Sequence, residues 1–101
     1  ANAKSEESVI EKTFEYAVKR FGIKKEEITS EKRGKEIILA RHFSIYVIRN
    51  STNLSQKSIA RLFNKKDHTT IINSIGFIER KMQNEPPFER EVNNFINELR
   101  S

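Results

Sequence analysis

The fold is decided by the stretch 55–78, SQKSIARLFNKKDHTTIINSIGFI. Ser55 can cap a short helix, and the apolar side chains that follow it recur at helical spacing. Asn64 tolerates the left-handed backbone conformation that ends a helix, and the two lysines after it complete a tight turn. Asp67 then caps a longer helix, because its carboxylate accepts amide protons from the first turn. A short helix, a turn of about three residues and a longer helix predict a helix-turn-helix.

The longer helix of this unit has one clearly apolar face. Its inward side chains recur at i, i+4, i+7 and i+11: Ile71, Ile75, Ile78 and Met82. The residues from Lys66 to Thr70 precede the first inward isoleucine, so their side chains are expected to face solvent.

The flanking segments also follow helical periodicity. A helix is predicted over about residues 5–21, with Ser5 as its cap and Gly22 as its left-handed stop. Residues 23–29 form a short helical turn or loop with Ile28 inward. Two prolines at 86–87 suit the first turn of a last helix, whose apolar side chains are Phe88, Val92, Phe95, Ile96 and Leu99.

Residues 35–49 are predicted to form the central and most buried helix. Ile38, Leu39, Phe43, Tyr46 and Val47 give it a broad apolar stripe. Its several β-branched residues would also suit a strand, but the spacing and the length favour a helix.

The chain is therefore predicted to be an all-α, compact bundle of five to six helices. It has 101 residues, no Asn-Gly or Asp-Gly hairpin signal and no internal repeat. Residues 5–101 are interpreted as one domain and residues 1–4 as a linker or a cloning remnant. No apolar run has the length of a membrane span, and the lack of cysteine excludes disulfides and thiolate zinc sites. Three widely separated glycines exclude a glycine-rich phosphate loop.

The charge of the chain is concentrated in its middle. Residues 30–84 carry eleven basic and four acidic side chains, a net charge of +7, whereas residues 1–29 sum to zero and residues 85–101 to −2. Such a partition would attract a polyanion through phosphate neutralisation and counterion release. A solvated basic face is the alternative interpretation.

The start of the longer helix carries residues that can read DNA bases. The second helix of a helix-turn-helix enters the major groove with its N-terminal residues. His68 can donate to guanine or thymine, the methyls of Thr69 and Thr70 can pack on thymine methyls, and Asp67 can accept from cytosine N4. A plain helix cap is an equally good interpretation of Asp67, and both roles can hold together.

Cationic side chains flank these candidate readers. The loop Glu31-Lys32-Arg33-Gly34-Lys35 could place an arginine in an A·T-rich minor groove, or it could be solvated charge. Further side chains could reach phosphates: Arg41, Arg49, Lys57, Arg61 and Lys65. The amides at the start of the shorter helix, near Lys57 and Ser58, could bind a phosphate as well.

Two other classes of function compete with DNA binding. A small hydrolase or metal-dependent nuclease would use Asp67 and His68, but no third ligand or base partner is evident. A protein-interaction module would dock its basic face on an acidic partner without dependence on nucleic-acid sequence.

At Ala40-Arg41-His42 and at Lys66-Asp67-His68-Thr69-Thr70 the chain resembles the C-terminal DNA-binding domain of DnaA, the bacterial replication initiator. This family carries an Ala-Arg-(His/Gln/Pro) step in its central helix and an Arg-Asp-His-(Thr/Ser)-Thr signature at its recognition helix. The resemblance runs without an obvious gap from about residue 30 to residue 82. It implies a helix-turn-helix bundle of the Trp-repressor-like type that binds DnaA boxes at a replication origin.

The resemblance also implies roles for particular positions. Arg33 matches an arginine that enters the minor groove, and residues 67–70 match the major-groove readers. Arg41 matches a position that contacts phosphate or supports the fold. The full predicted DNA-binding set is Arg33, Lys35, Arg41, Arg49, Gln56, Lys57, Lys65, Lys66, Asp67, His68, Thr69 and Thr70.

The chain departs from the family pattern in the helix-turn-helix itself. Asn64-Lys65 replaces a usual Gly-Gly pair, Lys66 replaces a usual arginine, and Leu54-Ser55-Gln56-Lys57 replaces a Leu-Pro step that contacts thymine methyls. These differences bear on the preferred box sequence more than on DNA binding itself.

The resemblance further implies a cytoplasmic, monomeric, non-enzymatic module that binds duplex DNA and no membrane. It implies no cofactor in this chain, since ATP would be bound by the AAA+ domain that precedes this module in DnaA. The chain could be a fragment of an initiator or a stand-alone DnaA-like regulator of transcription or of mobile-element replication.

Overall fold

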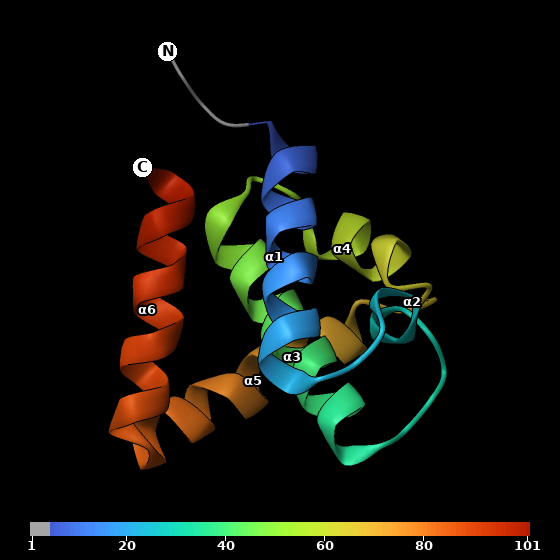
Figure 1. Cartoon of the computed structure of the whole chain (residues 1–101). Helices are drawn as coiled ribbons and strands as arrows, with labels where there is room; N and C mark the ends of the chain where they lie inside the picture. The colour runs from blue at the N-terminus through green and yellow to red at the C-terminus, as the bar shows by residue number, and fades with distance from the viewer. Residues whose placement is uncertain (1–4) are drawn as a thin grey trace.

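Six helices follow one another in the described part of the chain, residues 5–101 of a computed structural model (Figure 1). They are α1 (Glu6–Phe21), α2 (Lys25–Ile28), α3 (Lys35–Ser51), α4 (Gln56–Leu62), α5 (Thr69–Asn84) and α6 (Pro86–Arg100). No strand occurs in this range, so the predicted all-α bundle is confirmed. The predicted linker at 1–4 lies outside the described residues. No helix from residue 5 onward is long and apolar enough to cross a bilayer.

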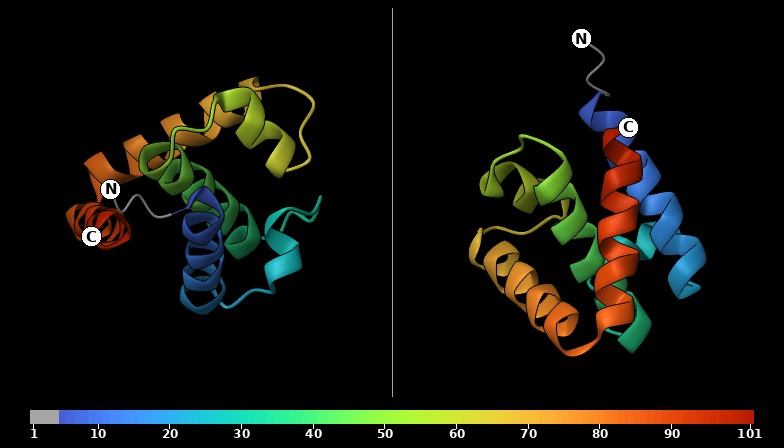
Figure 2. Two further views of the ribbon diagram at one scale, coloured as in Figure 1. Left: turned by 90° about the horizontal axis from the view of Figure 1, so that it is seen from above. Right: turned by 90° about the vertical axis from the view of Figure 1, so that its left-hand side faces the viewer.

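The central segment is a helix rather than a strand. α3 runs through the middle of the bundle, with α1 and α6 on one side and α4 and α5 on the other (Figure 2). Phe43, Ile45, Val47 and Ile48 are completely buried in the core that these helices share. β-Branched residues are tolerated here because burial of their side chains outweighs their modest helix propensity.

The boundaries of α1 follow the predicted signals. The Ser5 side chain accepts a hydrogen bond from the Ser8 amide at 3.1 Å. Gly22 ends the helix in the left-handed region, with φ of 68°. α2 then forms from the segment predicted as a short turn or loop, and its Ile28 is completely buried.

The helix-turn-helix is formed by α4 and α5. The Ser55 hydroxyl caps α4 by accepting from the Ser58 amide at 3.1 Å. Asn64 has φ of 59° and turns the chain, and the Lys65 amide donates to the Ala60 carbonyl at 2.7 Å. Phe63 is completely buried beneath the turn, so the two helices are fixed relative to the core.

The start of α5 differs from the prediction by one step. The helix begins at Thr69 and its N-cap residue is His68. Asp67, the predicted N-cap, is therefore the residue before the N-cap. Its carboxylate still accepts the Thr69 amide at 3.0 Å. The reason for the shift is that the His68 carbonyl accepts the first helical hydrogen bonds, from Ile71 and Ile72.

α6 closes the bundle against α1 and α3. It begins at Pro86 and Pro87, as the fixed φ of proline favours. On α1, Tyr16 and Arg20 both donate hydrogen bonds to Glu91 of α6. These polar links lie beside the stacked rings of Tyr16 and Phe95, whose centroids are 4.3 Å apart.

Candidate nucleic-acid interface

The residues at the start of α5 are accessible. Lys66, Asp67 and Thr69 are exposed, and His68 and Thr70 are partly exposed. The first inward side chain is the completely buried Ile71, as the sequence predicted. The helix therefore presents five consecutive polar residues at its N-terminal end.

Asp67 is held in place by the residue two positions after it. Its Oδ1 accepts both the Thr69 amide and the Thr69 hydroxyl, each at 3.0 Å. These hydrogen bonds, the backbone one first, hold the pKa of the Asp67 carboxyl below its usual range. The carboxylate is thus ionised at neutral pH and has a defined orientation.

The basic loop before α3 lies against the side of α5. Arg33, Lys65 and Thr70 line one hollow of about 350 Å³ between this loop, the helix-turn-helix turn and α5. Two segments that are 37 residues apart in the sequence, at 33 and 70, therefore border the same depression. The structure brings together the predicted minor-groove arginine and a predicted major-groove reader.

Two further hollows join α5 to α4 and to the end of α3. One, of about 270 Å³, is lined by Lys57, Lys65, Lys66, Asp67 and His68 together with Ala60 and Arg61. The other, of about 460 Å³, is lined by Arg49, Ser55, Gln56, Lys57 and His68. His68 borders both, so the α4 cations and the start of α5 form one continuous surface.

Two members of the predicted set lie outside these hollows. Thr69 is exposed on α5 between Asp67 and Thr70. Lys35 is exposed in the first turn of α3, next to the basic loop.

Arg41 is the member of the predicted set that lies nearly buried. Only 8% of this residue is exposed. Its Nε donates to the Ile28 carbonyl, and its Nη2 donates to the carbonyls of Glu27 and Lys32. The Nε and Nη2 donors are thus used inside the protein and support the fold. Arg41 also borders the hollow that holds Arg33 and Thr70, and its phosphate contact stays a prediction.

His42 joins α3 to α5 behind the interface. Its Nδ1 is 2.7 Å from the Ser74 hydroxyl, and its ring packs at 4.6 Å on that of Phe77. Burial, with the nearby Arg41 charge as a smaller cause, lowers the pKa of the imidazole. The neutral ring therefore helps to fix the rotation of α5 about its axis.

Sequence reasoning did not single out Asn73. This residue is exposed on α5 and borders the same hollow as Arg33 and Thr70. The signal was its spacing, because residue 73 follows Thr69 by one helical turn. Ile72 and Phe77 were also missed, and they are the large apolar side chains that stay exposed among the described residues, at 47% and 39%.

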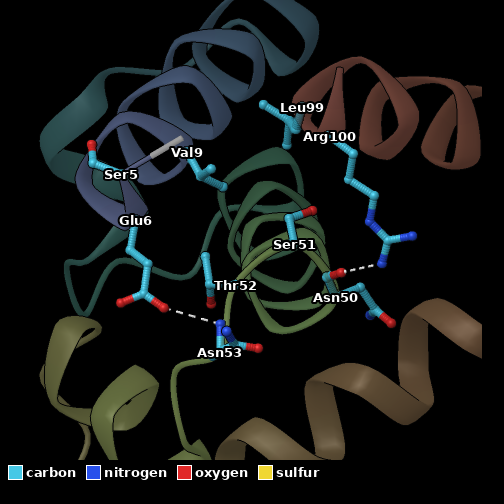
Figure 3. Close-up of a pocket in the computed structure, with 9 residues that line it drawn as sticks. All are labelled: Ser5, Glu6, Val9, Asn50, Ser51, Thr52, Asn53, Leu99 and Arg100. Carbon is cyan, nitrogen blue, oxygen red and sulfur yellow. Dashed lines mark hydrogen bonds between the residues drawn. The ribbon is translucent and has the colours of Figure 1, made fainter. Parts of the chain in front are cut away.

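A different hollow, of about 570 Å³, lies where α1 begins and where α3 and α6 end (Figure 3). Some of its polar groups pair with one another, whereas the buried Ser51 hydroxyl has no hydrogen-bond partner among the described residues. Glu6 accepts the Asn53 amide at 3.0 Å, and Arg100 donates to the Asn50 carbonyl at 2.8 Å. None of the predicted DNA-binding residues borders it.

Over residues 5–101, no group of three or more His, Cys, Asp or Glu side chains is arranged to hold a metal ion. The nearest approach to an acid–base pair at the interface joins Asp67 Oδ1 and His68 Nδ1, which are 3.5 Å apart.

Comparison with known proteins gives a consistent result. Residues 10–78 match the family described as the bacterial dnaA protein helix-turn-helix. A chromosomal replication initiator protein DnaA from Oleidesulfovibrio alaskensis is 40% identical over 77 residues, which are 76% of this chain and 16% of that protein. The corresponding protein of Geotalea daltonii is 34% identical over 98 residues, which are 97% of this chain and 22% of that protein.

A solved structure agrees with these relatives. The crystal structure of a DNA replication initiation factor superposes with a TM-score of 0.79 at 30% identity. The match covers 93% of this chain and 29% of that one. The chain thus spans about a fifth of the length of the curated relatives it matches.

Proposed function

Because the chain belongs to the bacterial DnaA helix-turn-helix family, we propose that it binds double-stranded DNA and recognises DnaA-box-like sites at a replication origin. The observation that supports this most is the surface around α5. Five accessible polar residues at the start of that helix are bordered on both sides by hollows with basic linings.

In this proposal the start of α5 enters the major groove. His68 donates to guanine or thymine acceptors, and Thr69 and Thr70 place their methyls against thymine methyls. Asp67 orients Thr69 and offers its remaining oxygen to cytosine N4. Binding by these contacts positions the protein on its site and involves no chemical reaction of the DNA.

The basic loop reads the adjoining minor groove. Arg33 is exposed and borders the same hollow as Thr70, so loop and helix can contact neighbouring grooves of one duplex. An A·T-rich minor groove is narrow and strongly negative, which favours an inserted guanidinium.

The phosphate contacts come from the other side of α5. Arg49 and Lys57 border one hollow with His68, on the ends of α3 and α4. Their charges position the protein on the backbone and carry no sequence information by themselves. The proposal requires no cofactor in this chain and one copy per site.

The direct test is fluorescence anisotropy with three DNAs over a range of salt concentrations. These are a DnaA-box duplex, a duplex of shuffled sequence and the single strand. The wild-type chain is expected to bind the box duplex most tightly, with an affinity for all three that falls as salt rises.

Two kinds of variant separate reading from positioning. Thr69→Ala and His68→Ala should each weaken binding to the box by about 1–3 kcal/mol and leave binding to the shuffled duplex nearly unchanged. Lys57→Ala should weaken both duplexes alike and reduce the salt slope by about 1. Equal losses for all three variants on both duplexes would contradict base reading.

A protein-interaction module would give a different pattern. Its basic face would bind box duplex, shuffled duplex and single strand with similar affinities at every salt concentration. That result would replace the proposed function with docking on an acidic partner.

A further inference from the structure

The solvent-facing side of α5 continues beyond its first turn. Thr69, Asn73 and Gly76 follow one another at i, i+4 and i+7, so they share one face of the helix. The opposite face is anchored by Ile71, Ser74 and Ile78, all buried. The rotation of the helix is therefore fixed, and this stripe points away from the core.

Asn73 has no evident role within the fold. It is exposed, and its carboxamide makes no hydrogen bond to another residue of the described chain. Asparagine is also a poor helix former, because its side chain competes for backbone hydrogen bonds. It nevertheless lies in the second turn of a 16-residue helix, where it borders the same hollow as Arg33 and Thr70.

Gly76 follows one turn later and is likewise unexplained by the fold. A Cβ at this position would meet only Arg80 Nη1, at 3.4 Å, which is ordinary contact with the end of a flexible side chain. Its backbone is helical, so no unusual dihedral requires glycine. The absence of a side chain at Gly76 leaves a shallow spot on the helix surface, and internal packing gains nothing from it.

Building on the proposed function, we propose that Asn73 is an additional base-reading residue that recognises an adenine in the major groove. The carboxamide accepts from adenine N6 and donates to adenine N7, the pairing that distinguishes A·T from the other base pairs. Gly76 leaves the helix face flat, so that the edge of the groove approaches the second and third turns of α5.

The position of Asn73 supports this reading role over a phosphate contact. It lies on the outward face one turn after Thr69, on the side of Thr70. Arg33 and Lys65 border the flank of the same hollow and are better phosphate or minor-groove partners because they are charged. The Asn73 carboxamide is neutral and planar, which suits a base edge.

The experiment measures how the affinity for a DnaA-box duplex changes when single adenines are replaced by 7-deazaadenine, which lacks the N7 acceptor. At one adenine the wild-type chain should lose about tenfold in affinity. Asn73→Ala should lose about tenfold on the unmodified duplex and nothing further at that adenine. Asn94→Ala, an exposed asparagine on α6, is the matched control and should behave as wild type.

Gly76→Ala provides a second measurement with opposite signs. Alanine should raise the thermal stability of the free domain, because it is a better helix former than glycine. The same variant should weaken binding to the box duplex several-fold by holding the groove edge away. Stability and affinity thus change in opposite directions.

The outcomes distinguish this inference from the proposed function. If wild type does not prefer the box over a shuffled duplex, the proposed function fails. If that preference is present, two results would each overturn the role of Asn73: an unchanged affinity of Asn73→Ala, or an equal loss on box and shuffled duplexes. An unchanged affinity of Gly76→Ala would overturn the role given to Gly76.

Discussion

Arg41 donates from Nε to the carbonyl oxygen of Ile28 at 2.8 Å, which connects the central helix α3 to α2. Its Nη2 adds the carbonyls of Glu27 at 3.1 Å and Lys32 at 3.0 Å. One buried side chain therefore holds three carbonyls of the segment that leads directly to Arg33. The geometry of the basic loop therefore depends on a residue that is itself almost entirely buried.

Arg41→Met is expected to destabilise the domain by about 1–3 kcal/mol, because it leaves one buried and two partly buried carbonyls without their donor. The free energy of unfolding in urea measures this. Arg49→Met, which removes an exposed arginine from the same helix, is the control and should change stability by less than about 0.5 kcal/mol. An unfolding midpoint of Arg41→Met equal to that of wild type would contradict this supporting role.

Arg33→Ala should leave stability unchanged, because the side chain is exposed. Its affinity should fall mainly for duplexes with an A·T-rich minor groove next to the major-groove site. Anisotropy with A·T-rich and G·C-rich flanks measures the difference, and Lys19→Ala on α1 is the control. An equal loss of affinity with both kinds of flank would show that Arg33 contributes only sequence-independent charge.

Asn64 tests the turn of the helix-turn-helix. Its φ of 59° is unfavourable for most residues, and its Nδ2 donates to the Thr29 carbonyl at 3.2 Å. Asn64→Gly and Asn64→Ala both lose that hydrogen bond, so their difference isolates the backbone cost. We expect alanine to be less stable than glycine by about 1 kcal/mol in thermal or urea unfolding. Equal stabilities would indicate that the turn rearranges.

His42 predicts a pH dependence of stability. Because burial lowers its pKa in the folded state below the ordinary value of 6.5, the unfolded chain binds more protons in that range. Its contribution is complete above about pH 6.5 and is lost as the pH falls toward the folded pKa. Urea unfolding between about pH 7.5 and 5.5 should show this decline for wild type and a smaller one for His42→Gln. Identical slopes would exclude His42 as the cause.

The link between α1 and α6 predicts unequal effects of two carboxylates. Glu91 accepts from Tyr16 and, at 2.6 Å and 3.2 Å, from Arg20 in a partly buried position. Burial opposes its ionisation, but these hydrogen bonds outweigh it and lower the Glu91 pKa. Glu91→Gln should destabilise by about 1–2 kcal/mol. Glu11→Gln, which breaks an exposed pair with Lys25, should cost less than about 0.5 kcal/mol.

Much of the fold could be predicted because its signals are local. Ser5, Gly22, Ser55 and Asn64 bound their helices through their own side chains or dihedrals. Periodic burial identified the inward face of α5 down to Met82. The same spacing distinguished α3 from a strand despite its β-branched residues.

What escaped prediction depends on contacts between distant segments. The burial of Arg41 requires carbonyls at 27, 28 and 32, which no spacing in α3 reveals. The hollow shared by Arg33 and Asn73 exists only once α3 has packed on α5. The N-cap of α5 was predicted one residue too early, at Asp67, because the sequence does not show which carbonyl accepts the first helical amide.

The Thr69 hydroxyl donates its single proton to Asp67. Only lone pairs and a methyl group therefore remain for whatever approaches this threonine. The major-groove edge of guanine offers two acceptors and so cannot form a hydrogen bond with this hydroxyl, whereas an exocyclic amine can donate to it. A hydrogen bond of 3.0 Å between two exposed side chains thus makes the Thr69 hydroxyl an acceptor in the free protein.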